Sequence, residues 1–187
     1  CPVLLTEPQS TNRVTQSNDF NSSSWTKVDS SVVEGFVSPD GSSNAYKLVE
    51  DTSNNEHRIG GGISVTSGNS YTFSAFVKKA ENDWFRMALF GKGSTRVYFD
   101  LINGTVGTSQ SLVLNPFIES YSNDWYRIGF TYATTATEAI IPSLFLAQQD
   151  NEPSYLGDGV SGTYIYGAQL EELSYSTSLI PTYGAVR

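Results

Sequence analysis

The chain has 187 residues, of which 39% are hydrophobic, 13% aromatic and only 16% charged, with a formal net charge of −8. This length suits one domain with a substantial core, and the aromatic content excludes a disordered chain. The acidic balance disfavours nucleic acid and membranes as partners. No apolar run is long enough to predict a transmembrane helix.

The sequence begins Cys1-Pro2-Val3, without Met and without a signal-peptide pattern. We therefore expect a module of a larger multidomain polypeptide. The lone cysteine cannot close an internal disulfide, which argues against a small disulfide-stapled animal domain. A secreted bacterial protein and the surface of a virion are both consistent with this cysteine usage.

The first thirty residues are polar and irregular, and we expect them to pack on the domain as an irregular N-terminal segment. After them, short alternating runs are separated by turn signals, a pattern typical of an all-β sandwich or barrel. The predicted strands cover 45–50, 57–65, 70–79, 84–90, 95–101, 111–119, 125–132, 138–147 and 163–173. Because helical crossovers are missing, residues 1–187 are predicted to form a single antiparallel β-sandwich of two packed sheets.

Turn residues refine this prediction. Asn103-Gly104 predicts a tight type I′ hairpin. Pro116 interrupts its run, so that segment is predicted to be an edge strand or to be bulged. The run Gly60-Gly61-Gly62 indicates a bulge within a strand.

Successive side chains of a strand point to opposite faces, so alternation assigns the core. In the last strand it puts Tyr164, Tyr166, Ala168 and Leu170 in one row, with Gln169 opposite. The residues expected between the sheets are Tyr71, Phe73, Val77, Met87, Leu89, Ile128, Phe130, Leu144 and Leu170.

Two related tetrads carry the strongest functional signal, Trp84-Phe85-Arg86-Met87 and Trp125-Tyr126-Arg127-Ile128. Each puts a tryptophan and an arginine on one strand face. Indole stacks on the C–H face of a sugar ring, and guanidinium donates to hydroxyl or acidic groups. We hypothesise that Trp84 is a stacking platform for a polysaccharide. The alternative is that arginine stacks on tryptophan as surface packing, or that both plug an end of the sandwich.

The polar contacts expected beside Trp84 are Arg86, Arg58, His57 and Gln169, all on one sheet. Trp125 follows a turn-like Asn123-Asp124, which favours a structural role, although Trp125 and Arg127 remain in the candidate ligand-binding set. The arginines would suit a sulfated or uronate polymer, as found on cell surfaces or in marine material. The net charge of −8 weighs against that preference.

Catalysis has few candidate groups. His57 is the single histidine, no G-x-S-x-G motif is present, and Cys1 is terminal. No pair of acids is placed for glycoside hydrolysis. We expect a non-enzyme, and a polysaccharide lyase that pairs His57 with a tyrosine remains an alternative.

No cofactor is expected to be required. Loops such as 150–152 and 157–159 carry Asp, Asn and Glu oxygens that could hold a structural calcium ion, although their spacing matches no EF-hand. The sequence assigns no metal ligands.

Motifs along nearly the whole chain resemble those of carbohydrate-binding-module-like domains of the family 4/9 jelly-roll type, found in phage tail and fibre proteins and in bacterial polysaccharide-degrading enzymes. The resemblance begins at Leu4-Leu5-Thr6-Glu7-Pro8 and is most specific at Gly167-Ala168-Gln169-Leu170-Glu171-Glu172. It also covers Trp25-Thr26-Lys27, Ser38-Pro39-Asp40-Gly41, Ala45-Tyr46-Lys47-Leu48, Tyr71-Thr72-Phe73-Ser74, Phe99-Asp100-Leu101, Trp125-Tyr126-Arg127 and Ile180-Pro181-Thr182.

The resemblance implies a jelly-roll sandwich that binds glycans without cleaving them and tethers a parent enzyme or particle to a polysaccharide. It does not fix the ligand. Trp125 belongs to the shared motifs, which favours a structural role for it, whereas Trp84 and Arg86 fall where the pattern is looser. The main alternative is a structural module of a phage tail or head fibre without its own glycan site.

Overall fold

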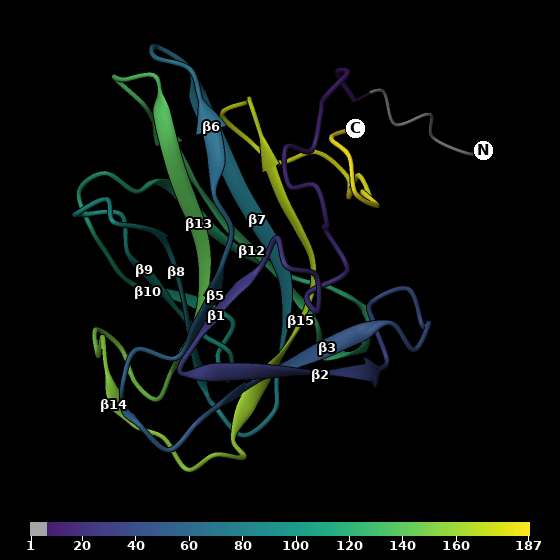
Figure 1. The fold of residues 1–187 in the computed structure, drawn as a ribbon, viewed down its shortest axis with the longest axis vertical. Helices are drawn as coiled ribbons and strands as arrows, with labels where there is room; N and C mark the ends of the chain where they lie inside the picture. Colours follow the sequence, from purple (N-terminus) through teal and green to yellow (C-terminus); the bar gives the residue numbers. More distant parts are fainter. Residues whose placement is uncertain (1–6) are drawn as a thin grey trace.

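The computed structural model describes residues 7–187, so Cys1 and the Leu4-Leu5-Thr6 part of the family motif lie outside the described residues. Those residues form a sandwich of antiparallel sheets (Figure 1). Within residues 7–187 the only helical element is the 3₁₀ turn Ser122–Asp124. That part of the chain holds no helix both long and apolar enough to cross a membrane.

The first sheet, sheet A, has the strand order β1-β5-β13-β8-β9-β10, with β6 also paired to β13. Its strands are β1 (Thr26–Val28), β5 (Arg58–Gly60), β6 (Ile63–Val65), β8 (Trp84–Phe90), β9 (Val97–Asp100), β10 (Thr105–Ser109) and β13 (Glu138–Ala147).

The second sheet, sheet B, has the order β11-β12-β7-β15-β3-β2. Its strands are β2 (Ser30–Phe36), β3 (Ala45–Glu50), β7 (Ser70–Lys79), β11 (Leu114–Ser120), β12 (Tyr126–Ala133) and β15 (Gly162–Glu171), and β4 (Asn54–Asn55) pairs separately with β14 (Tyr155–Leu156). The chain crosses repeatedly between the sheets, as in a jelly roll. The predicted all-β antiparallel sandwich is confirmed.

The core between the sheets is the one that alternation predicts. All nine side chains expected there are buried, and they belong to one continuous cluster. Phe73 on β7 lies opposite Phe130 on β12, with the two rings edge to face and their centroids 6.4 Å apart. Every second residue of both strands belongs to the core cluster, which fixes the register, because a slip of one residue would move a core ring to the outer face of sheet B.

Several strand boundaries differ from the prediction. β1 lies within the segment expected to be irregular, and β2, β10 and the short β4 and β14 were not predicted. The single strand predicted at 57–65 is two strands, β5 and β6, separated by Gly61-Gly62. Sequence alternation is weak in these segments because they are short or polar on both faces.

One of the two turn predictions is confirmed and the other is wrong. β11 is the edge strand of sheet B and its register shifts between Leu114 and Phe117, so the prediction from Pro116 is confirmed. The type I′ hairpin at Asn103-Gly104 is wrong, because Gly104 has a positive φ of 64° and Asn103 does not. The Asp100 carboxylate instead accepts bonds from the backbone N–H groups of Ile102 and Asn103, which shapes a longer turn.

The face assignment of β15 is wrong in its first half, because Tyr164 and Tyr166 lie on the outer face, whereas Ala168 and Leu170 enter the core as predicted. Gly167 has a φ of +61°, and the β15–β7 register shifts between Tyr166 and Gln169. The extra residue of this bulge moves Gln169 to the same outer face as Tyr166, whereas Ala168 enters the core. Glycine suits this position because its backbone is left-handed and an added Cβ would lie 3.0 Å from Leu179.

Residues that follow the bulge form hydrogen bonds with both terminal segments. Gln169 accepts a bond from Ile180 N and donates to Ser178 O, while the buried Glu171 carboxylate accepts from the N–H and hydroxyl of Thr177. Asn12, from the N-terminal segment, accepts from Leu170 N and donates to Ala168 O. The Gly-Ala-Gln-Leu-Glu motif therefore fastens the ends of the chain onto sheet B.

Replacing Phe73 or Phe130 with Ala should lower the free energy of unfolding by about 3–5 kcal/mol, because each leaves a cavity between the sheets. Urea denaturation followed by tryptophan fluorescence measures the change. The exposed Leu156 provides a matched control, and Leu156→Ala should change stability by less than about 0.5 kcal/mol. A parent-like midpoint for Phe73→Ala would contradict the core assignment.

Candidate functional site

The outer face of sheet A carries a straight row of side chains on neighbouring strands. Arg58 on β5 lies opposite Phe145 on β13, Phe145 lies opposite Arg86 on β8, and Arg86 lies opposite Tyr98 on β9. The row therefore alternates cation and aromatic ring across the sheet. Cross-strand neighbours of this kind are within contact distance.

Both guanidinium groups of this cation–aromatic row lie over rings. The Arg86 guanidinium carbon is 3.7 Å from the Phe145 ring centre. The Arg58 guanidinium carbon is 3.5 Å from the centre of Phe90, the last residue of β8. Burial lowers the pKa of Arg58, the nearby Arg86 lowers it further, and Glu56 opposes the change. Ring faces thus hold two cations close together.

Arg86 is the fixed centre of the row. It is 1% exposed, it donates to the Glu56 carboxylate at 2.8 Å, and it donates to the carbonyl oxygen of Pro153 at 3.1 Å. Its Nε has no acceptor among the described residues. Arg86 therefore organises the face, and most of its hydrogen bonds are already made within the protein.

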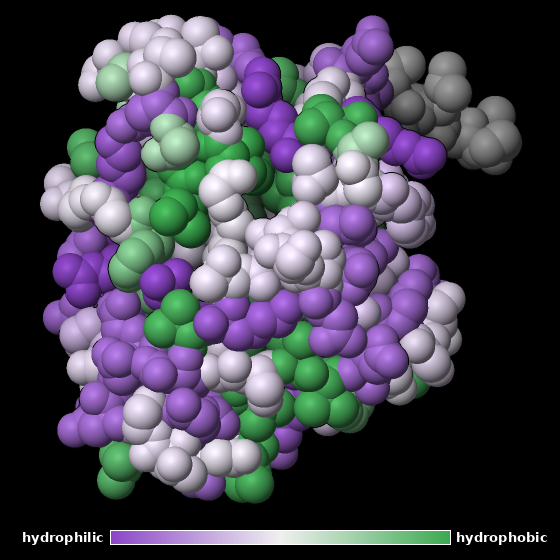
Figure 2. Space-filling model, viewed as in Figure 1, coloured by the Kyte–Doolittle hydropathy of each residue, from purple (hydrophilic) through white to green (hydrophobic). Residues whose placement is uncertain are grey.

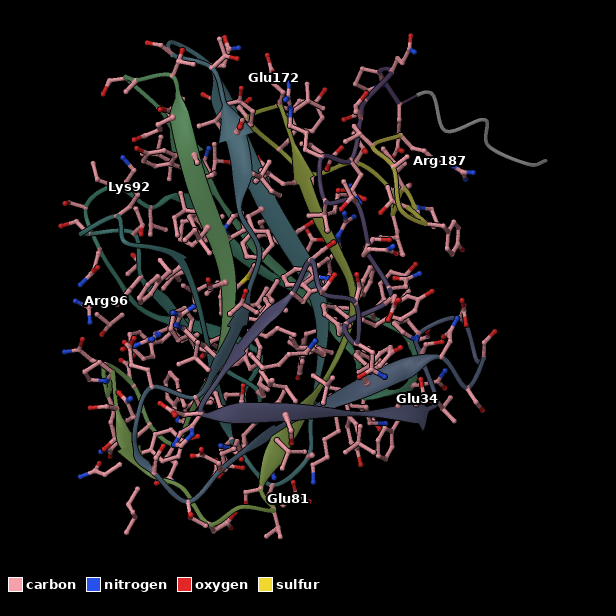
Figure 3. The ribbon with its side chains drawn as sticks, viewed as in Figure 1. Glu34, Glu81, Lys92, Arg96, Glu172 and Arg187 are labelled. Atoms are coloured by element: carbon pink, nitrogen blue, oxygen red, sulfur yellow. The ribbon has the colours of Figure 1, made fainter. Side chains whose placement is uncertain are left out.

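Beside the row lies a hollow of about 330 Å³. Arg86, Phe145 and the small Ala88 line one part, and Phe90, Lys92 and Arg96 line the other. Lys92 and Arg96 lie on the same side of the molecule, next to β8, β9 and β10 (Figure 3). Phe90 is 39% exposed, so an aromatic surface borders this cationic hollow.

Trp84 shares the outer face of sheet A with Arg86, as predicted. Its indole lies against the backbone of Gly107, where an added Cβ would be 2.6 Å from the ring and 2.8 Å from Asp150. The side chain is half-buried. Trp84 is therefore partly packed on β10, and only its remaining surface is available to a ligand.

The expectation that His57 contacts a ligand does not fit its position. The ring is fully buried, with Nδ1 2.6 Å from Asp29 O and Nε2 3.3 Å from Tyr155 O. Tyr155 is the tyrosine that a lyase would need beside it, but that ring is also buried. Burial and the hydrogen bond to Glu50 raise the pKa of Tyr155, so it is a poor general base.

The remaining candidates lie on sheet B, so the prediction that Gln169 shares a sheet with Trp84 is wrong. Gln169 is fully buried and bonded to the C-terminal segment. Trp125 is 1% exposed and packs with Phe76, Tyr166 and Ala45 in a second apolar cluster on the outer face of sheet B. This position agrees with the structural role expected for Trp125.

Arg127 occupies the same outer face of sheet B. Its guanidinium carbon is 5.4 Å from the Phe76 ring centre, and its NH2 group donates to the Ser74 hydroxyl at 3.3 Å. Burial lowers its pKa. The two Trp-x-Arg tetrads thus lie on opposite outer faces of the sandwich and do not form one site.

The loops proposed for calcium use their carboxylates internally. Asp150 accepts from the N–H and hydroxyl of Thr108, and Asp158 accepts from Val160 N, Ser161 N and the Ser161 hydroxyl. These bonds lower the pKa of Asp158 to about 2. Within residues 7–187, no three His, Cys, Asp or Glu side chains gather as a metal-binding group.

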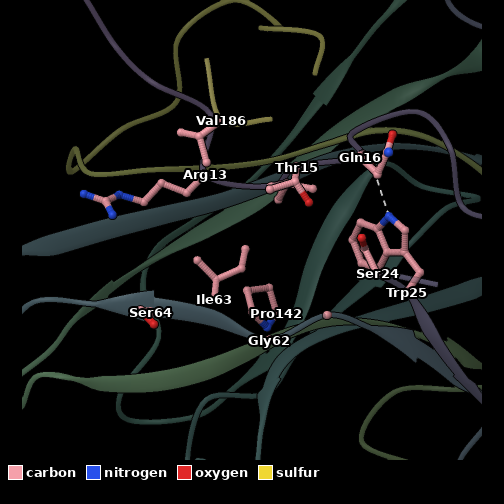
Figure 4. Close-up of a pocket in the computed structure, with 12 residues that line it drawn as sticks. Arg13, Thr15, Gln16, Ser24, Trp25, Gly62, Ile63, Ser64, Pro142 and Val186 are labelled. Carbon is pink, nitrogen blue, oxygen red and sulfur yellow. Dashed lines mark hydrogen bonds between the residues drawn. The ribbon is translucent and has the colours of Figure 1, made fainter. Parts of the chain in front are cut away.

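A separate crevice of about 300 Å³ lies between the N-terminal segment and β6 (Figure 4). Figure 2 shows it as a recess with apolar residues along one wall. Trp25 borders the crevice but is only 4% exposed, and its indole N–H donates to Gln16 O at 2.8 Å. The ring therefore offers little surface for stacking a sugar.

Phe90, Phe145, Tyr98 and Arg96 are the residues of the sheet A face that sequence reasoning did not select. Alternation along 84–90 does put Phe90 on the face of Arg86, so part of the signal was available. The contributions of β9 and β13 depend on which strands become neighbours. A single sequence does not give that order.

No family model and no curated protein matches the chain. Among solved structures, it is similar to the enzymatically active domain of bacteriophage CBA120 tailspike protein 4, with 14% identity over 85% of this chain and a TM-score of 0.49. It is also similar to TmCBM61 in complex with β-1,4-galactotriose, with 12% identity over 85% of this chain and the same TM-score of 0.49. A CBM4 structure matches with 16% identity over 84% of each chain and a TM-score of 0.43.

The chain spans 21% of the tailspike chain and 97% of the TmCBM61 chain. Both classes named by the sequence resemblance, carbohydrate-binding modules and a phage tail protein, are present among these structures. Similarity at this level assigns no ligand or activity to this chain. A function for it has to be inferred from its own side chains.

Replacing Arg86 with Ala should lower the free energy of unfolding by about 3 kcal/mol, because it leaves the Pro153 carbonyl and the Glu56 carboxylate without their donor. Chemical denaturation measures this. Arg96→Ala is the matched control on the same face, and its half-exposed side chain should contribute less than about 0.5 kcal/mol. Equal effects of the two changes would show that Arg86 does not organise the face.

Proposed function

We propose that this domain is a non-catalytic module that binds an anionic polysaccharide on the outer face of sheet A. The observation that carries the proposal is the accessible end of the cation–aromatic row, where Arg58 stacks on the 39% exposed Phe90 beside the hollow lined by Lys92 and Arg96. Four of the eleven Lys and Arg residues gather there in a chain of net charge −8.

Two of these four cations are neutralised within the protein. Arg86 pairs with Glu56, and Lys92 pairs with Glu138. Arg58 and Arg96 have no carboxylate at ion-pair distance among residues 7–187. A uronate or sulfate group would supply the missing negative charge.

The stacking of Arg58 on Phe90 favours such a ligand. A guanidinium whose face rests on a ring keeps its in-plane N–H groups free to donate, and those groups match the two oxygens of a carboxylate or sulfate. Phe90 and the exposed part of Trp84 provide apolar surface for the C–H faces of sugar rings. The face thus offers both contacts that an acidic sugar requires.

The proposal includes a role for the module within a larger protein. Bound in this way, the module would hold a parent enzyme or virus particle at a polysaccharide outside the cell, as one part of a longer polypeptide. A catalytic role has less support, because His57 and Tyr155 are both buried away from solvent.

The test compares a polyuronate, a sulfated galactan and a neutral galactan by affinity electrophoresis and calorimetry. Arg58→Gln and Arg96→Gln should each weaken binding of the anionic polymers about tenfold, equivalent to about 1.4 kcal/mol. The parent should also bind the anionic polymers less tightly when salt rises from about 0.01 to about 0.1 M, because the Debye length falls from about 30 to about 10 Å.

Arg13→Gln is the matched control, because it removes one positive charge at the crevice rather than on the sheet A face. It should leave binding unchanged. Equal losses in Arg13→Gln and Arg96→Gln would reduce the effect to net charge and overturn the site. A parent protein that retains none of the polymers, and forms a stable oligomer, would favour the fibre-structural alternative.

A further inference from the structure

The geometry points to a second glycan-binding site, for a neutral sugar, in a cleft at the loop end of the sandwich. The cleft measures about 800 Å³ and lies where the loop after β7, the β9–β10 turn and the β11–β12 connection meet. That volume is typical of ligand pockets. The inference shares with the proposed function the premise that the domain binds glycans, but it uses none of the residues of the sheet A face.

Tyr121 is the aromatic surface of this loop-end cleft. It is 53% exposed, yet it is held in place from two sides. Its backbone N–H donates to Trp125 O at 2.7 Å, and its ring lies edge to face with Phe76 at 5.0 Å and 74°. A half-exposed ring that is already immobilised loses little conformational entropy on stacking against a sugar.

Ile102 also lines the cleft and is 58% exposed. The Asp100 carboxylate fixes this turn by accepting from Ile102 N at 2.8 Å and from Asn103 N at 3.0 Å. Exposed large side chains on two rigid turns border the same cleft. This arrangement suits a flat ligand with apolar faces, such as a pyranose ring.

Both lysines that line the cleft are paired with aspartates, in contrast to Arg58 and Arg96 on the sheet A face. Lys78 lies 3.7 Å from Asp124, and Lys79 lies 2.8 Å from Asp83. The Lys78 ammonium also donates to Asn123 O at 2.8 Å. The cleft therefore combines donors and acceptors without a net charge, which matches hydroxyl groups that both donate and accept. A neutral sugar fits this set better than a uronate or sulfate.

Trp125 supplies a second, independent observation. It lines the cleft and is 1% exposed, and its indole Nε1–H has no acceptor among the described residues. A buried donor without an acceptor costs about 1–3 kcal/mol. A ligand hydroxyl or its bridging water would offset that cost at this position.

The experiment titrates the intact domain with neutral cello-, xylo-, manno- and galacto-oligosaccharides, following ¹H–¹⁵N NMR shifts and calorimetry. We expect at least one series to shift the amide signals of Tyr121, Ile102 and Asn123. Tyr121→Ala should weaken that binding at least tenfold, as for other central aromatic anchors. Ile102→Gln should also weaken it, and it tests the site even if Tyr121→Ala proves unstable.

Tyr175→Ala is the matched control, because Tyr175 is 50% exposed and lies outside the cleft. It should bind like the parent. If no neutral series shifts cleft signals, or if Tyr121→Ala and Ile102→Gln both bind like the parent, the second site is wrong. Loss of a dimer in Tyr121→Ala, seen by light scattering, would show that the cleft holds another copy of the chain and would equally overturn it.

The two sites fail separately. Anionic polymers that bind the parent and lose affinity in Arg58→Gln, together with no neutral ligand at the cleft, would refute only the second site. Neutral oligosaccharides that bind the parent and Arg58→Gln alike, together with no anionic binding, would refute only the sheet A face.

Discussion

A two-layer sandwich gives each sheet two faces, and only one of them can enter the shared core. The rest of this structure depends on which side chains and segments cover each of the two outer faces. Sheet B covers part of its outer face with the second apolar cluster of Trp125, Tyr166 and Phe76, and with both terminal segments. Sheet A instead carries the cation–aromatic row and its hollow. The contacts on sheet B support the fold, whereas on sheet A the buried Arg86, Phe145 and Tyr98 leave Phe90 and the hollow beside it at the surface.

Closing sheet B requires burial of polar groups, and their hydrogen bonds explain why the terminal motif is so specific. A buried carboxylate is unfavourable unless several donors satisfy it. Glu171 is fully buried and accepts from Thr177 N, the Thr177 hydroxyl and the Ser10 hydroxyl. Gln169 and Asn12 bond the same terminal segments. A sequence motif that stands out by its polar residues is here a structural clamp rather than a ligand site.

The core could be predicted from the sequence because period-two alternation is local, and Phe73 and Met87 each follow from their own strand. Tyr164 and Tyr166 could not be placed, because the bulge at Gly167 reverses the alternation relative to Leu170 without a signal beyond one glycine. Only part of the sheet A face could be predicted from the sequence. Trp84 and Arg86 share a strand, but Phe145 joins them only through the order of β5, β13 and β8. Burial of His57 depends on Asp29 and Tyr155, which are distant in sequence.

An acidic protein that binds a polyanion meets opposing electrostatic effects, and their range decides between them. The net charge of −8 repels the polymer at a distance, but at physiological salt that repulsion is screened beyond about 8 Å. Within contact distance the nearby groups dominate, and there Arg58 and Arg96 have no carboxylate partner among residues 7–187. Aromatic rings can hold such cations where carboxylates would neutralise them, since a ring face attracts a guanidinium without occupying its N–H donors. Pairing Arg58 with Phe90 therefore keeps a positive charge available for a ligand, whereas the Lys–Asp pairs of the loop-end cleft cancel theirs.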